Sequence, residues 1–283
     1  MDRDEGRLKV IQNIKEAVKR GALNSKVEIN DHIVTEDERE EKIIHFDNQR
    51  NSPIRQFKKA IARNIANSYT KIFNVDTEIE GIENIKNIKG GAIITSNHFS
   101  PQDSTIIRHF TNKIGKRNHL DIIIEEENIF MEGQLGFLMN NCSTLPISKS
   151  KEYMSKNLMP AIGKLLSKKD FILIYPEEQM WFNYRKVRPL KIGAYHIASK
   201  FNVPVIPCFI EIRDKKEYDS NGFKKLKYIL HIMPPIYPEL GKDIKENKSE
   251  MCKKDYKLKV DMYEKCYGKK MNYEFDDTDI AGF

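Results

Sequence analysis

Short apolar runs alternate with amphipathic segments between residues 90 and 233, and this alternation constrains the fold more than any other feature. The apolar runs have the length of strands and lie at Ala92–Thr95, Ile122–Glu125, Thr144–Ile147, Phe171–Tyr175, Val205–Ile210 and Tyr228–Met233. Helical patterns follow at Ser104–Asn112, Gln134–Asn141, Glu152–Ser167, Leu190–Lys200 and Lys253–Tyr267. Such alternation is typical of βαβ units, so we predict an α/β fold with a mixed, largely parallel sheet flanked by helices.

The composition is that of a globular protein, with 40% hydrophobic and 31% charged residues. No apolar run reaches the roughly 18 residues of a membrane span, and the first residues lack the apolar region of a secretory signal. The cysteines form no Cys-x-x-Cys pair and are interpreted as reduced thiols of a cytoplasmic protein. The net charge of +7 favours anionic partners: phosphate head groups, a lipid surface, nucleic acid or an acidic carrier protein.

The chain divides into three parts. Residues 1–52 are polar, with one short amphipathic helix formed around Leu8 to Val18, and are interpreted as an N-terminal extension. Residues 53–270 form the main domain. Residues 271–283 form an acidic tail, which we expect to be flexible.

The main domain opens with a basic amphipathic helix, predicted over residues 53–74. One stripe of this helix is apolar and consists of Ile54, Phe57, Ile61, Ile65, Tyr69 and Ile72. Arg55, Lys59 and Arg63 lie on the opposite side. The pattern fits two placements: a helix lying on an anionic membrane, or a helix whose stripe packs on the core and whose basic back is solvated.

A histidine and an aspartate follow the first strand of the predicted sheet. They lie in Asn97–Asp103, directly after Ala92–Thr95, and are His98 and Asp103. A neutral imidazole can take a proton from an attacking hydroxyl, and a nearby carboxylate can orient the ring and stabilise the imidazolium that forms. Ligand sites of α/β sheets lie at the carboxyl ends of strands, which is where this pair is expected.

The residues between them indicate the start of a helix. Ser100 suits the N-cap, Pro101 the first helical position, and Asp103 the third, as in a capping box. His98 then lies on the preceding loop, one turn from Asp103. The alternative is a capping aspartate and a loop histidine that never meet.

Four segments in one order give this pair its context. They are Asn97–Asp103; Gly136–Leu138 with Leu145–Ser150; Ile174–Glu178 with Arg188–Ala194; and Val203–Pro207. Over roughly residues 90–210 this pattern resembles the family of 1-acyl-glycerol-3-phosphate acyltransferases and related lysophospholipid acyltransferases. The resemblance implies transfer of an acyl group from a thioester, on coenzyme A or acyl carrier protein, to a hydroxyl of a lysophospholipid-like acceptor.

The resemblance also implies roles for individual residues. His98 corresponds to the general base of the family, and Asp103 to the aspartate that orients it. An activated thioester needs a base and correct placement but no nucleophilic serine or cysteine. The residues expected to bind substrate are Asn97, Lys149, Glu177, Arg185, Lys186 and Arg188.

The head-group side departs from the family pattern. Lys149 stands where the family has an arginine, and Glu178, Gln179 and Met180 replace its Gly-Thr-Arg. Arg185, Lys186 and Arg188 are expected to supply the missing cation; the alternative is a solvated basic loop. Trp181, Phe182 and Tyr184 suit either an interface or core packing.

We therefore predict a peripheral, cytoplasmic-face acyltransferase of phospholipid synthesis. The spacing of the histidines and cysteines indicates no metal site, and the only co-substrate expected is the acyl thioester. Its partners would be the lysolipid acceptor, acyl-CoA or acyl carrier protein, and an anionic membrane surface, not nucleic acid. Two alternatives stay open: a different lyso-lipid or glycolipid acceptor, and a non-catalytic basic membrane-surface protein.

Overall fold

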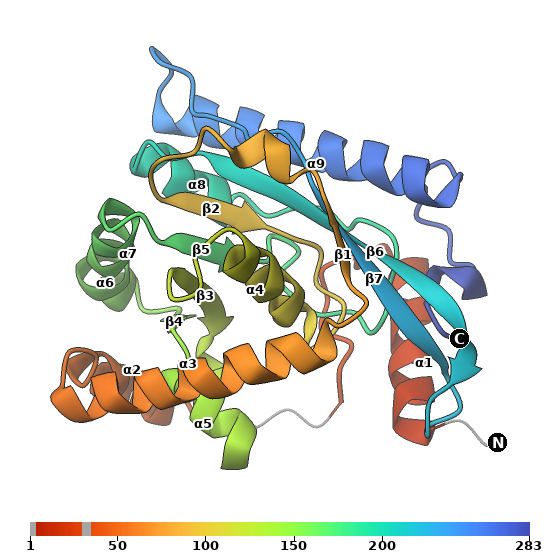
Figure 1. Ribbon diagram of the computed structural model, residues 1–283, viewed down its shortest axis with the longest axis horizontal. Coiled ribbons are helices and arrows are strands. Elements are labelled where there is room, and N and C mark those ends of the chain that lie inside the picture. The colour runs from red at the N-terminus through yellow and green to blue at the C-terminus, as the bar shows by residue number, and fades with distance from the viewer. Residues whose placement is uncertain (1–3, 30–34) are drawn as a thin grey trace.

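The computed structural model describes residues 4–29 and 35–283, which build a seven-stranded sheet in the order β1-β7-β6-β2-β5-β3-β4 (Figure 1). The strands are β1 Glu78–Glu80, β2 Ala92–Thr95, β3 Leu120–Glu125, β4 Thr144–Ile147, β5 Phe171–Ile174, β6 Val205–Tyr218 and β7 Lys224–Ile232. All neighbouring strands are parallel except β6 and β7, which form an antiparallel hairpin. The predicted mixed, largely parallel α/β sheet is confirmed.

Helices cover both faces of the sheet (Figure 1). They are α1 Glu5–Lys19, α2 Glu36–Asn48, α3 Pro53–Phe73, α4 Asp103–Lys113, α5 Gly133–Asn141, α6 Lys151–Tyr153, α7 Met159–Ser167, α8 Gly193–Lys200 and α9 Ile244–Tyr267. In β2, Ile93 packs into a core with α7 and α8, whereas Ile94 packs into a second core with α4. Since side chains alternate along a strand, the continuous apolar run of β2 is buried on both sides.

Two elements differ from the sequence prediction for local reasons. The helix expected over Glu152–Ser167 is interrupted by a π-helical turn at Met154–Leu158, just before Pro160, which has no N–H for a helical bond. Strand β1 was not predicted because it is short and two of its three residues are glutamates.

Helix α3 packs on the domain through its basic face, the face that would be solvated if the apolar stripe packed on the core. Its apolar stripe points away from the protein: Ile54 is 70% exposed, Phe57 68% and Ile72 75%. Arg63 points inward, and its Nε donates to Ser143 Oγ over 2.6 Å. Lys59 Nζ lies 3.7 Å from the buried Asp121. The alternative in which the stripe packs on the core is therefore wrong.

The N-terminal extension packs against the domain. As expected, an amphipathic helix forms here: α1 buries Val10 and Ile14 in a cluster with Trp181 and Tyr184. Arg7 Nη1 pairs with Asp219 Oδ2, 2.7 Å away, in the turn of the β6–β7 hairpin. The aromatic residues after β5 thus serve as core rather than as an interface.

The acidic tail also packs, so the prediction of a flexible segment is wrong. Ile280 and Ala281 are buried, and Ile280 forms an antiparallel bridge with Tyr184. Asp279 Oδ2 lies 2.8 Å from Lys186 Nζ, and both side chains are almost fully buried. The tail was misjudged because its acidic residues suggested solvation, whereas Asp279 has its partner, Lys186, in a segment about ninety residues earlier.

Candidate active site

The loop between β2 and α4 carries His98 and is held by the neighbouring strand. Asn97 Nδ2 donates to Ile210 O over 3.0 Å, and Ile210 N–H donates back to Asn97 Oδ1 over 2.8 Å. Asn97 is buried, and its amide is occupied by β6. Its expected role in substrate binding is therefore corrected to one of anchoring the loop.

The structure brings His98 and Asp103 together. His98 Nδ1 lies 2.8 Å from Asp103 Oδ2. The same oxygen accepts the N–H groups of Phe99 and Ser100, 3.0 and 3.2 Å away, and Ser100 Oγ accepts the N–H of Gln102. The bond from the Ser100 N–H to Asp103 is one half of the predicted capping box. The other half differs, because Ser100 Oγ accepts the N–H of Gln102 rather than that of Asp103, and the regular helix begins only at Asp103. The alternative in which the two residues never meet is wrong.

Tyr175 completes this arrangement and was not singled out in the sequence. Its ring stacks on the His98 imidazole, with ring centres 4.0 Å apart and planes 16° from parallel. Its hydroxyl donates to Asp103 Oδ1 over 2.6 Å. Burial, together with the Asp103 carboxylate, raises the pKa of Tyr175 well above its ordinary value, so the phenol stays neutral and donates. Both carboxylate oxygens of Asp103 thus have hydrogen-bond partners. The His98 ring is held by the stacked ring of Tyr175 and by the contact of Nδ1 with Asp103.

Glu177 and Arg188 form a buried ion pair behind the loop. Arg188 Nη2 lies 2.9 Å from Glu177 Oε2, and the Arg188 N–H donates to Oε1 over 3.0 Å. The His98 N–H donates to Glu177 Oε2 over 3.3 Å, and Arg188 Nη2 donates to His98 O over 3.3 Å. Both side chains are 1–2% exposed. The expected contact of these two residues with substrate is therefore corrected: they position the His98 backbone.

The other two cations of this segment are also used internally. Lys186 pairs with the buried Asp279 and donates to Glu274 O over 2.5 Å. Arg185 pairs with Asp214 over 2.5 Å and donates to Thr278 O over 2.7 Å. Neither the expected phosphate-binding cluster nor its alternative, a solvated basic loop, describes this segment. The sequence shows the charges but not the acidic partners on β6 and the tail.

Lys149 is the expected cation that remains exposed. It follows β4 at the carboxyl edge of the sheet, as His98 follows β2. In the order β2-β5-β3-β4 the two strands are three steps apart, or about 14 Å at ~4.8 Å per step. No ion pair of Lys149 occurs within residues 4–29 and 35–283.

A further polar pair lies near the His98 side chain. Gln179 Nε2 donates to Glu125 Oε1 over 2.6 Å, and Glu125 ends β3. Burial raises the pKa of Glu125, while the nearby His98 and the amide of Gln179 act in the opposite direction. Gln179 is one of the residues that depart from the family pattern. The sequence shows that Gln179 departs from the family pattern, but it does not show that Glu125 is its hydrogen-bond partner.

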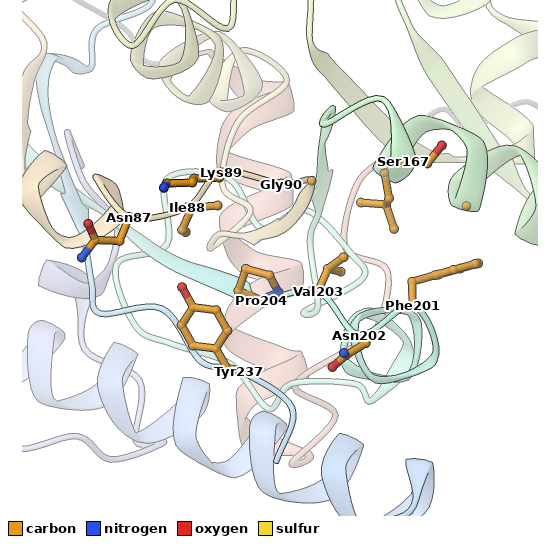
Figure 2. Close-up of a pocket in the computed structure, with 13 residues that line it drawn as sticks. Asn87, Ile88, Lys89, Gly90, Ser167, Phe201, Asn202, Val203, Pro204 and Tyr237 are labelled. Carbon is orange, nitrogen blue, oxygen red and sulfur yellow. The ribbon is translucent and has the colours of Figure 1, made fainter. Parts of the chain in front are cut away.

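A cavity of about 470 Å³ lies at the opposite ends of the strands from His98. Figure 2 shows Gly90, Pro204 and Tyr237 around it. Gly91 directly precedes β2, and Pro204 directly precedes β6, so the cavity is at the amino ends of these parallel strands. His98 follows the carboxyl end of β2, and the cavity is therefore not part of the His98 site.

Comparison with known proteins agrees with this arrangement. Residues 76–211, which hold β1 to the first half of β6, match a family model described as Acyltransferase. The matched segment is a little under half of the chain and contains the His98 loop, so this segment is similar to acyltransferase domains. The 1-acyl-sn-glycerophosphate (LPA) acyltransferase PlsC from Thermotoga maritima has a similar fold: its crystal structure superposes with a TM-score of 0.51 at 16% identity, over 94% of this chain and 96% of that one. A comparison with curated protein sequences gives no match.

Replacing Glu177 by glutamine tests whether this carboxylate is structural. The change leaves Arg188 buried without a counter-charge, so we expect the free energy of unfolding to fall by about 3–5 kcal/mol in urea denaturation. Glu178→Gln is the matched control, since the Glu178 side chain is half exposed and lies 3.8 Å from an equally exposed Lys191. Equal stability of the two variants would contradict the structural role.

Proposed function

We propose that the protein transfers a fatty acyl group from an acyl thioester, on coenzyme A or acyl carrier protein, to a hydroxyl of a lysophosphatidic-acid-like acceptor in phospholipid synthesis. The arrangement of His98, Asp103 and Tyr175 is the observation that carries this proposal. Asp103 engages Nδ1 and leaves Nε2 for the substrate, and the His98 side chain is 21% exposed while Asp103 is buried. One edge of an oriented imidazole thus faces outward.

The proposed reaction needs only this oriented base. His98 Nε2 takes the proton of the acceptor hydroxyl as its oxygen attacks the thioester carbonyl carbon. A C–O bond forms, and Asp103 stabilises the imidazolium. The tetrahedral intermediate then collapses, the C–S bond breaks, and the proton passes from Nε2 to the departing thiolate. No covalent acyl-enzyme is required.

We further propose that α3 holds the protein on a membrane surface through its apolar stripe. No helix among the described residues is both long and apolar enough to cross a bilayer. The stripe is exposed over the length of α3, and Val75 just beyond it is 83% exposed. The inward basic residues are occupied by the domain, so binding would depend on apolar burial more than on charge.

The link between α3 and the catalytic loop supports this placement. Asn74 Nδ2 donates to Thr105 Oγ1 over 3.0 Å, and Asn112 Nδ2 donates to Asn67 Oδ1 over 3.1 Å. Both bonds join α3 to α4, whose first residue is Asp103. A lipid surface under α3 would therefore lie at a fixed position relative to His98.

A different head group is the second candidate for the acceptor. Arg185, Lys186 and Arg188 are all paired inside the domain, which leaves Lys149 as the expected phosphate contact. Met180 stands where the family has its arginine, so the segment beside Gln179 and Glu125 lacks that cation. A lyso-lipid or glycolipid with a polar uncharged head group would not need it.

His98→Ala tests the base. We expect acyl transfer to fall about 10²–10⁴-fold, because a positioned general base contributes that much. The assay uses labelled acyl-CoA and acyl carrier protein thioesters with a panel of lysolipids. His119→Ala is the matched control, because His119 Nδ1 also lies against an aspartate, Asp170, at the opposite edge of the sheet. A variant lacking His98 that keeps more than about a tenth of the rate would refute the mechanism.

Replacing Ile54, Phe57 and Ile72 by serine tests membrane binding. Each is at least two-thirds exposed, so the triple variant should fold normally and lose vesicle flotation, while wild-type flotation persists at high salt. Lys58→Ala, on an exposed position of the same helix, is the control. A variant that floats like wild type but changes from dimer to monomer in gel filtration would instead identify the stripe as an interface between copies.

Lys149→Ala tests the acceptor. A charge-assisted hydrogen bond contributes about 1.5–3 kcal/mol, so the KM for lysophosphatidic acid should rise roughly ten- to hundredfold with the thioester KM unchanged. Lys151→Ala, two residues away and also exposed, should have no effect. Wild-type KM values that are equal for phosphate-bearing and uncharged acceptors would favour the second candidate.

A further inference from the structure

Three different metal-binding side chains meet on the face of the β6–β7 hairpin under α9. They are Glu211 of β6, His231 of β7 and Cys266 of α9, and their donor atoms all lie within 4.8 Å of one another. His231 Nε2 is 2.9 Å from Glu211 Oε2 and 3.4 Å from Cys266 Sγ. Glu211 and His231 are buried, and Cys266 is partly buried.

The fold fixes this meeting point. In the antiparallel register Phe209 is opposite His231 and Glu211 is opposite Ile229, so Glu211 and His231 are diagonal neighbours on one face. Cys266 lies in the last turn of α9, which packs on that face. This cluster could not be predicted from the sequence, because Glu211 and Cys266 are 20 and 35 residues from His231 and follow no common ligand spacing.

Neighbouring charged side chains hold the donor atoms of His231 and Glu211 in place. His231 Nδ1 lies 3.1 Å from Oε2 of Glu80, its register partner on β1. A carboxylate that accepts the Nδ1 proton directs the Nε2 lone pair toward a metal. Arg213 Nε holds the other oxygen of Glu211, Oε1, at 2.6 Å, which leaves Oε2 facing His231 and Cys266.

We propose that Glu211, His231 and Cys266 bind one divalent transition-metal ion of the zinc class. One thiolate, one imidazole and one carboxylate form a mixed donor set that suits zinc, and sulfur makes magnesium or calcium a poor match. The observed donor separations need to widen only slightly to place an ion about 2.0–2.3 Å from each. Binding releases the thiol proton of Cys266, and water takes the fourth position.

The ion would act as a clamp on the catalytic half of the sheet. Glu211 follows Ile210, whose backbone holds the side chain of Asn97 next to His98. A metal bond from Glu211 to Cys266 would tie the end of α9 to that stretch of β6. None of the three ligands belongs to the His98 arrangement, so the proposal is independent of the acyl-transfer chemistry.

Cobalt binding to the untagged full chain, after treatment with a chelator, tests the site. We expect one Co²⁺ per chain, a thiolate-to-cobalt charge-transfer band, and loss of that band on addition of Zn²⁺. Cys266→Ser should abolish the band. Cys252→Ser, on the same helix and hydrogen-bonded to Leu190 O, is the matched control and should keep it.

A second variant, Glu80→Gln, tests the site even if Cys266→Ser does not fold. Glu80 is mostly exposed, so Glu80→Gln should fold normally and weaken Zn²⁺ binding about 10–100-fold in a chelator competition, as loss of such a carboxylate partner does. A wild-type protein without the band, a band that persists in Cys266→Ser, or unchanged Zn²⁺ affinity in Glu80→Gln would each overturn the proposal.

Discussion

The buried ion pair between Glu177 and Arg188 connects the loop that carries His98 with the N-terminal extension. Its two side chains bond to the N–H and to the carbonyl oxygen of His98, so the loop between β2 and α4 is fixed to the pair. Arg188 Nη1 also donates to Leu23 O over 3.4 Å, and Asn24 donates to the backbone of Glu177 and Pro189. The N-terminal extension is thereby attached to the same point. Because removing one partner of a buried pair is far more costly than keeping both, these segments are mutually dependent.

The contact between His98 and Asp103 could be predicted because its geometry is local. His98 and Asp103 are five residues apart, and a strand followed by a tight helical turn is enough to bring them together. Strand β2 was predicted with its observed bounds for a similar reason, since a strand buried on both faces is a continuous apolar run. Tyr175, which fixes the second oxygen of Asp103, directly follows another strand, β5, and only the sheet order places it there.

What could not be predicted depends on partners distant in the sequence. The periodicity of α3 is the same whether its apolar or its basic face meets the domain; the buried Asp121 and the carbonyl of Asn140, which Arg55 contacts at 2.5 Å, decide the outcome. In the same way, Arg185 and Lys186 are cations whose acidic and carbonyl partners lie on β6 and in the tail. A count of charges indicates an anionic ligand, whereas the fold supplies the anion itself. Sequence patterns therefore predicted the sheet and the contact of His98 with Asp103, but not the direction in which the basic side chains point.

The inverted orientation of α3 connects these observations. An amphipathic helix normally buries its apolar face, and leaving large apolar residues in water costs ~25 cal/mol per Å² relative to burial. The domain side of α3 instead buries Asn67 and Thr70, together with Asn74 at its C-cap. Both asparagines bond to α4. Polar contacts of this kind fix orientation more strictly than an apolar seam, because each donor needs one particular acceptor. The helix that presents an apolar surface is thus fixed to the helix that begins with Asp103, so whatever covers that surface is held at a defined distance from His98.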